Sequence, residues 1–200
     1  IYAVADDGTG ASPISNTVQT TYTNSLPRTY SATTISVPTV WTAGSAPIYT
    51  LNGAMTIASG ATLWIQPGVT VSIGGNYKMT ATGSLVARGT ESNRVVFRPV
   101  QALCTDTSVR RTDWPGIETG GAIGRVDMEY VNIYCATNGV YFNLGTGRLA
   151  FTRILNGGAG VYTLGSSSVM TAPQIVGQNE LRGNNHGIWI GINSRPVVSG

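Results

Sequence analysis

Asp127 and Glu129 are the carboxyl groups that come nearest to a catalytic pattern, because they flank the apolar Met128. Alternate side chains of a β-strand face the same side, so both carboxylates would point outward from one strand, about 7 Å apart. Such a pair could act as a general acid and a general base. Arg148 follows Asp127 by 21 residues, the repeat length described below, which favours a solvated ion pair between Asp127 and Arg148. We therefore assign no catalytic residue.

The histidine and the paired aspartates near the N-terminus do not form a metal or cofactor pattern. His186 lies in the run 183–187 (Gly-Asn-Asn-His-Gly), which invites comparison with the Gly-His-Gly of pectin hydrolases. The paired aspartates and the Arg-x-Lys of those enzymes are missing, and a polar turn residue explains His186 better. The run 6–8 (Asp-Asp-Gly) lacks the spaced ligands of a calcium loop and fits a hairpin turn. Two cysteines and one histidine give no zinc-ligand spacing, so we predict neither a metal nor a cofactor.

Cys104 and Cys135 are the two cysteines of the chain. A pair of cysteines in a Lys-poor sequence rich in Thr, Ser and Asn is compatible with an oxidising compartment. We predict a disulfide between them, and two free buried thiols are the alternative. The segment 98–113, which also contains Asp106 and Arg110, interrupts the repeat. It is either a binding loop, as long excursions from a solenoid often are, or a charged loop pinned by the Cys104–Cys135 bridge.

Tyr141, Tyr162 and Trp189 are the aromatic residues best placed to bind a ligand. Alternation along the strand turns Val140 and Phe142 inward and Tyr141 outward, and the repeat places Tyr162 and Trp189 in the same row. Neighbouring strands of a sheet lie about 4.8 Å apart. We predict an outward ladder of three rings, suited to stacking on sugar rings or on a partner's side chains. The alternative is a patch covered by a loop, a subunit or a downstream segment.

Short apolar strands recur along the chain at a nearly constant spacing. One set recurs after 22 residues, and its aligned pairs are Met55 with Tyr77, Ile57 with Met79, Leu63 with Leu85, and Ile65 with Ala87. A second set recurs after 21 residues and then after 27, and its aligned triplets are Met128, Leu149 and Val176; Tyr130, Phe151 and Gln178; Ile133, Ile154 and Leu181; Gly139, Gly160 and Gly187; and Val140, Val161 and Ile188. The longer step implies a six-residue insertion between Thr163 and Gln174.

These periods predict an all-β fold, a right-handed parallel β-helix. Each turn of the chain would hold three short strands and could not bury its inward side chains alone, so successive turns must stack to form a core. A helical repeat is excluded because the apolar residues alternate with a period of two and glycines interrupt every longer stretch. The right-handed winding follows from the chirality of parallel crossover connections.

Several segments resemble a known family. They are residues 60–71 (Gly-Ala-Thr-Leu-Trp-Ile-Gln-Pro-Gly-Val-Thr-Val), 83–90 (Gly-Ser-Leu-Val-Ala-Arg-Gly-Thr), 95–97 (Val-Val-Phe), 114–117 (Trp-Pro-Gly-Ile), and the later Asn-Gly-Val and Asn-Asn-His-Gly-Ile-Trp-Ile runs. Together they resemble right-handed parallel β-helix repeat proteins of bacterial and archaeal surfaces, over residues 48–200. The resemblance implies the fold but little about activity, because this fold hosts lyases, hydrolases, adhesins and structural fibres.

The sequence divides into three parts. Residues 1–22 read as a strand, an Asp-Gly turn and a second strand, and they resemble the last two strands of a fibronectin type III domain. Residues 23–47, with prolines at 27, 38 and 47, are expected to form a linker or capping segment. Residues 48–200 form the parallel β-helix. We expect the chain to be a piece of a larger mature protein, with the β-helix incomplete at its C-terminal end.

Charge is scarce, with 12 basic and 9 acidic residues and a net charge of +3, which argues against a nucleic-acid partner. No apolar run has the length needed to cross a bilayer. Repeat regularity without a catalytic cluster predicts a non-enzymatic extracellular structural or adhesive protein at the cell surface, such as a subunit of a filament or stalk. Its partners would be other copies of itself, other surface proteins or carbohydrate. The alternatives are a polysaccharide lyase or glycoside hydrolase whose catalytic coils lie outside this sequence, and a passive glycan-binding module.

Overall fold

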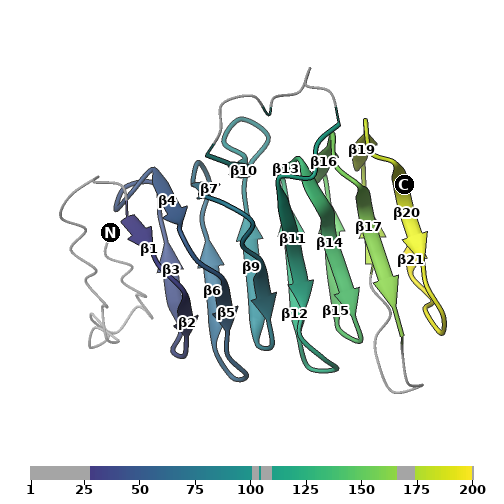
Figure 1. The fold of residues 1–200 in the computed structure, drawn as a ribbon, viewed down its shortest axis with the longest axis horizontal. Coiled ribbons are helices and arrows are strands. Elements are labelled where there is room, and N and C mark those ends of the chain that lie inside the picture. The colour runs from purple at the N-terminus through teal and green to yellow at the C-terminus, as the bar shows by residue number, and fades with distance from the viewer. Residues whose placement is uncertain (1–27, 101–103, 105–109, 166–173, 200) are drawn as a thin grey trace, which may run out of the picture.

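The computed structural model describes residues 28–100, 104, 110–165 and 174–199, and these residues form a parallel β-solenoid (Figure 1). Three parallel sheets of seven strands each run along the solenoid, and the described residues contain no helix. None of them therefore forms a helix that could span a membrane. The hairpin predicted at residues 1–22, with its resemblance to fibronectin type III, lies outside the described residues.

Each turn of the chain, called a coil here, contributes one strand to each sheet. Sheet 1 consists of β1 (Arg28–Tyr30), β4 (Ile48–Leu51), β7 (Thr70–Ile73), β10 (Val95–Pro99), β13 (Val131–Tyr134), β16 (Arg153–Leu155) and β19 (Glu180–Arg182). Sheet 2 consists of β2 (Thr33–Ile35), β5 (Met55–Ile57), β8 (Met79–Ala81), β11 (Trp114–Thr119), β14 (Ala136–Asn143), β17 (Ala159–Leu164) and β20 (His186–Ile190). Sheet 3 consists of β3 (Thr39–Trp41), β6 (Thr62–Ile65), β9 (Ser84–Arg88), β12 (Arg125–Glu129), β15 (Thr146–Ala150), β18 (Gln174–Val176) and β21 (Val197–Val198). Right-handed winding stays a prediction from the chirality of parallel crossovers.

The core is built from inward side chains that stack from coil to coil. Ile133 pairs with Ile154 across β13 and β16, and Ile154 pairs with Leu181 across β16 and β19. Ile133 and Ile154 are buried, and Leu181 is partly buried against the same core. This ladder confirms the spacing of the second repeat. Full burial of each such side chain stabilises the fold by about 1.5–3 kcal/mol relative to an exposed one.

The first repeat is offset differently from the prediction. Met55 pairs with Met79, and Ile57 pairs with Ala81, so the predicted partners Tyr77 and Met79 were wrong by two residues. The corner between β7 and β8 is two residues longer than the corner between β4 and β5, whereas the next corner, before β9, is two residues shorter. The two differences cancel, which is why Leu63 still pairs with Leu85 as predicted.

The last repeat is also shifted at one strand. Leu149 pairs with Ile175, and the predicted partner Val176 pairs with Ala150 instead. The predicted 27-residue step is correct in the other two sheets, where Ile154 pairs with Leu181 and Val161 with Ile188. The solenoid strands also begin earlier than residue 48, because β1, β2 and β3 lie within the segment expected to be a linker or cap.

Corner residues form their own ladders. Tyr130, Phe151 and Gly177 follow equivalent strands of sheet 3, and all three have positive φ angles (51°, 48° and 73°). L-residues other than Gly, Asn and Asp rarely adopt this left-handed conformation. The side chains of Asn179 and Asn184 support the corners, since they hydrogen-bond backbone groups of the preceding coil.

Candidate functional site

The predicted aromatic ladder is present on the outer face of sheet 2. Tyr141 pairs with Tyr162, and Tyr162 with Trp189, across β14, β17 and β20. The ring centroids of Tyr141 and Tyr162 are 4.6 Å apart with a 12° angle between the rings, whereas Trp189 is tilted by 42° against Tyr162 at 5.4 Å. Because the two tyrosine rings stack face to face, their flat faces cover each other and leave mainly edges for a ligand. A glycan contact on this ladder stays a prediction, and its geometry favours it only at Trp189, which is 51% exposed.

Glu118 precedes the ladder in the same outward row, paired with Tyr141. Its carboxylate is held by Lys78 Nζ at 2.5 Å and accepts a hydrogen bond from Asn143 Nδ2 at 2.9 Å. Burial, followed by the neighbouring Tyr162 and Glu118, raises the pKa of the Tyr141 hydroxyl above its ordinary value. The ladder is thus a tightly contacted, neutral stripe.

Asp127 and Glu129 face outward from β12 as predicted, but their ion pairs differ from the prediction. Asp127 is bound by Arg125 Nε at 2.7 Å and not by Arg148, whose Nη1 lies 3.8 Å from Glu129 Oε2. Arg125 lies two residues before Asp127 on the same strand and faces the same side, so it reaches Asp127 more directly. Glu129 is also paired with Arg88. Cations therefore hold both carboxylates, and the pair offers no free acid or base.

The disulfide between Cys104 and Cys135 is confirmed, with Cα atoms 6.3 Å apart. After this bridge the chain returns along the corner that joins sheets 1 and 2. The Arg110 guanidinium bonds Asn185, the Arg111 amide donates to the Asn156 carbonyl, and the Asp113 amide donates to the Cys135 carbonyl. The described part of segment 98–113 thus fastens several coils together. Asp106 lies outside the described residues.

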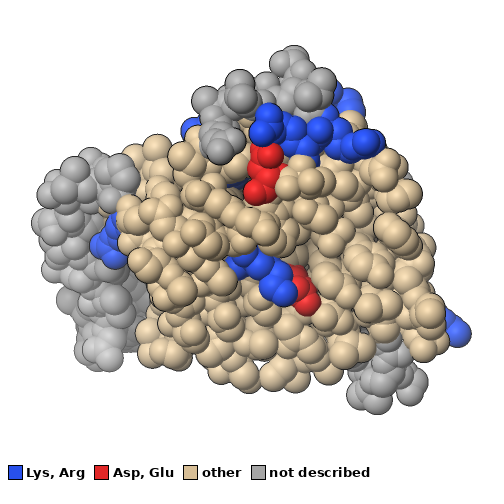
Figure 2. All heavy atoms as spheres, viewed as in Figure 1, with Lys and Arg blue, Asp and Glu red and all other residues tan. Residues whose placement is uncertain are grey.

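His186 is the first residue of β20 and is exposed, whereas the sequence had suggested a turn before the strand. Its ring lies edge-on against Trp189, with centroids 4.8 Å apart. Among the described residues, no group of three or more His, Cys, Asp and Glu could hold a metal ion. The surface seen in Figure 2 is mostly uncharged, and basic side chains gather along its upper edge.

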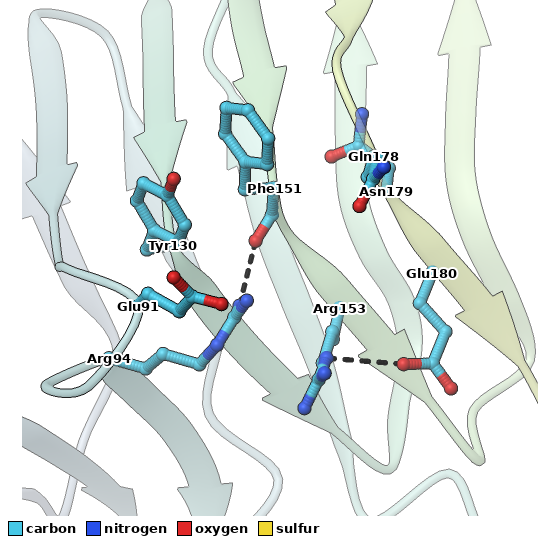
Figure 3. A pocket seen from close by; sticks show the side chains of 8 residues that line it. All are labelled: Glu91, Arg94, Tyr130, Phe151, Arg153, Gln178, Asn179 and Glu180. Carbon is cyan, nitrogen blue, oxygen red and sulfur yellow. Dashed lines mark hydrogen bonds and ion pairs between the residues drawn. The ribbon is translucent and has the colours of Figure 1, made fainter. Parts of the chain in front are cut away.

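A polar depression of about 380 Å³ lies at the corner between sheets 3 and 1. We call it the corner depression (Figure 3), and its lining residues are Glu91, Arg94, Tyr130, Phe151, Arg153, Gln178, Asn179 and Glu180. Tyr130 and Phe151 form one wall, and their rings are stacked at 4.7 Å with a 6° angle. Its volume is that of a small-molecule site.

Arg94 projects into the corner depression from the segment before β10 (Figure 3). Its Nη1 donates to the Phe151 carbonyl at 2.7 Å and to Asn132 Oδ1 at 3.3 Å, and its Cζ lies 5.5 Å from the Tyr130 ring centroid. Both acceptors are neutral, and no described carboxylate lies within 4.0 Å as an ion-pair partner of Arg94. Burial, followed by the nearby Arg153 guanidinium, lowers the pKa of Arg94 below its ordinary value. Arg94 is thus a half-buried cation with no compensating anion beside it.

The opposite side of the corner depression is an ion-pair network. Arg153 Nε lies 3.1 Å from Glu180 Oε2, and Arg182 Nε lies 2.7 Å from Glu180 Oε1. Asn179 turns its side chain to the backbone, where its Oδ1 accepts a hydrogen bond from the Thr152 amide at 2.8 Å. Arg94 and Arg153 therefore supply the donors that a ligand in the depression would meet.

The sequence analysis missed this depression, although two signals pointed to it. It aligned Tyr130 with Phe151 as equivalent repeat positions. The 27-residue step that relates Ile154 to Leu181 also relates Arg153 to Glu180, which places opposite charges on adjacent strands. Arg94 could not be added by the same logic, because the excursion 98–113 breaks the repeat between β10 and β13.

The corner depression has no counterpart in other proteins from which a function could be transferred. The chain matches no protein-family model, no curated protein and no solved structure.

Proposed function

We propose that this chain is an extracellular structural and adhesive β-solenoid, whose adhesive contact is made by binding an acidic glycan in the corner depression. The observation that carries the proposal is the state of Arg94. This guanidinium is half-buried, lies against the Tyr130 ring, and has no ion-pair partner among the described residues. A partly desolvated cation without an anion is costly, and a ligand carboxylate would offset that cost.

The other residues of the corner depression fit a sugar ligand. Planar polar side chains, namely Arg153, Gln178 and Glu91, can exchange hydrogen bonds with ring hydroxyls. The stacked edges of Tyr130 and Phe151 supply an apolar wall. Three arginines, Arg94, Arg153 and Arg182, stand against two glutamates, Glu91 and Glu180, so the local charge balance favours an anionic ligand.

The structural part of the proposal rests on the solenoid. Its three continuous sheets are covalently stapled by Cys104–Cys135 and bound along one corner by Arg110, Arg111 and Asp113. A disulfide is compatible with an oxidising, extracellular location. Surface labelling of native cells with a membrane-impermeant reagent would test the location, since a protein protected from the reagent would contradict it.

Binding is tested with oligomers of a hexuronic acid and of the corresponding neutral hexose, measured by calorimetry at two salt concentrations. We expect the acidic oligomer to bind more tightly and its affinity to fall as salt rises. Arg94→Ala should weaken binding roughly tenfold or more, by analogy with loss of a charged hydrogen-bonding partner. Arg98→Ala is the matched control, because Arg98 is an exposed arginine on the neighbouring strand β10 and does not line the depression. Equal affinity for both oligomers, or equal loss in both variants, would refute an Arg94 site.

A polysaccharide-cleaving enzyme is the alternative proposal. The carboxylates that could serve it, Asp127, Glu129 and Glu180, are each held by arginine. Cleavage of any acidic polysaccharide by the purified chain, abolished by Asp127→Ala, would replace adhesion with catalysis.

A further inference from the structure

A second depression lies on a different face of the solenoid, around Trp64 on the outer side of sheet 3. Its volume is about 380 Å³, and it is lined by Val40, Trp64, Ile65, Gln66, Pro67, Val86, Arg88 and Gly89. We call it the Trp64 groove. None of its residues lines the corner depression, so the two sites can be tested separately.

Trp64 stands between two smaller side chains. It pairs with Val40 on β3 and with Val86 on β9, and its neighbours Leu63 and Ile65 on the same strand are buried in the core. The indole is 38% exposed, and among the described residues no aromatic ring stacks on it. This differs from the ladder on sheet 2, where the flat faces of Tyr141 and Tyr162 cover each other. Trp64 therefore keeps ring surface available to a ligand.

The polar groups of the Trp64 groove are Gln66 and Arg88. Gln66 is exposed, with an amide that both donates and accepts. Arg88 Nη1 lies 2.5 Å from Glu129 Oε2, so its charge already has a partner and the groove does not require an anion. The remaining guanidinium donors can still bind uncharged oxygen atoms.

We propose that the Trp64 groove binds a neutral sugar ring, with the apolar face of the ring on the Trp64 indole and its hydroxyls on Gln66 and Arg88. A hexose has the same division as the groove, an apolar face of C–H groups bordered by hydroxyls. Charge also matches, because a neutral ligand leaves the Arg88–Glu129 pair intact. This inference goes beyond the proposed function, since the face, the residues and the class of ligand all differ.

The test uses the whole chain with neutral probes, namely linear β-1,4-glucan and β-1,4-mannan hexamers. Saturation-transfer NMR and calorimetry should detect binding of at least one hexamer, with a salt-independent affinity. Trp64→Ala should weaken it roughly tenfold, as expected for loss of an aromatic stacking partner. Trp189→Ala is the matched control, because Trp189 is also exposed but lies on sheet 2. It should change the affinity less than about twofold.

Folding of the variants is checked by circular dichroism and thermal unfolding. If Trp64→Ala does not fold, Trp64→Phe replaces it, and a smaller ring should retain part of the binding while losing several-fold in affinity. Failure of both hexamers to bind the unmodified chain would overturn the proposal, as would equal losses in the Trp64 and Trp189 variants. Self-association that Trp64→Ala abolishes, without sugar binding, would assign the groove to a second copy of the chain instead.

Arg94→Ala separates this proposal from the corner depression. It should leave binding of the neutral hexamer unchanged, because Arg94 does not line the Trp64 groove. Loss of neutral binding in Arg94→Ala would contradict the Trp64 groove, whereas loss of acidic binding alone would not affect it.

Discussion

Tyr130 and Phe151 stack with their ring centroids 4.7 Å apart, and both hold a backbone conformation that non-glycine residues seldom adopt. Their corners follow paired strands, β12 and β15, so each coil places its ring over that of the coil before. Above Phe151 the equivalent residue is Gly177, and a Cβ atom there would lie 3.3 Å from the Phe151 ring. The stack thus ends on a glycine, which leaves room for the ring.

This stack should contribute measurably to stability. We expect Phe151→Ala to lower the free energy of unfolding by about 1–2 kcal/mol, because it removes both the stacking and the associated burial. Chemical denaturation of the two proteins measures the difference. Ile123→Ala is the control, since Ile123 is 67% exposed and its truncation should change stability by less than about 0.5 kcal/mol. A Phe151 variant as stable as this control would show that the ring stack is energetically neutral.

Gly139 is required by close packing and not by an unusual φ angle. A Cβ atom at this position would overlap Ile154 Cγ2 and lie 2.6 Å from the Gly160 carbonyl oxygen. We expect Gly139→Ala to destabilise the chain by about 1–3 kcal/mol, the usual range for overpacking. Thermal unfolding is the measurement, with Gly44→Ala as the control.

At Gly44 the added Cβ would meet no atom nearer than Thr42 Oγ1 at 4.0 Å. Gly44→Ala should therefore be neutral or stabilising by up to about 1 kcal/mol, because it restricts the unfolded chain. If both alanine variants unfolded at the same temperature, the close approach at Gly139 would carry no energetic weight.

Reduction of the disulfide should destabilise the solenoid. Cys104 and Cys135 are 31 residues apart, and a crosslink over such a loop contributes about 2–4 kcal/mol, mainly by restricting the unfolded chain. The melting temperature should fall when a reductant is added. A Cys104→Ser, Cys135→Ser double variant should already melt at the lower temperature and show no response to reductant. An unmodified chain that ignores the reductant while its thiols titrate as free would contradict this expectation.

Alkaline pH should weaken the fold partly through Tyr141. Burial, then Tyr162 and Glu118, raises the pKa of its hydroxyl, so the unfolded chain ionises first, near pH 10. The stabilising contribution is fully present below the pKa of an unfolded tyrosine, and it is lost as pH rises through the folded value. Tyrosinate absorbance should show one late-titrating group that is absent from Tyr141→Phe. Stability measured above pH 10 should fall more steeply in the unmodified chain than in this variant, and equal slopes would rule out a role for Tyr141.

The fold could be predicted from the sequence because its evidence is local and repeated. The alternation of Val140, Tyr141 and Phe142 decides which side chains face the core, and the 21-residue step places Ile133 beside Ile154. Both follow from strand geometry, in which side chains alternate and equivalent residues of successive coils stack. The disulfide was predictable for a simpler reason, since the chain has two cysteines.

Corners and side-chain partners could not be predicted in this way. The register of Met55 depends on corner lengths, which vary by two residues and are not constrained by the alternation of the strands. Asp127 binds Arg125 and not Arg148, because the direction of a flexible side chain decides between two arginines of similar reach.

The sequence by itself determined a stack of three-stranded coils with a defined inside and outside, because hydrophobic burial depends on residue type and period alone. The tertiary structure decided where binding sites form. It brought Arg94 beside Phe151, 57 residues later in the chain, across the excursion that breaks the repeat, and it left Trp64 exposed between two valines. Such depressions depend on packing between coils, which no single repeat specifies.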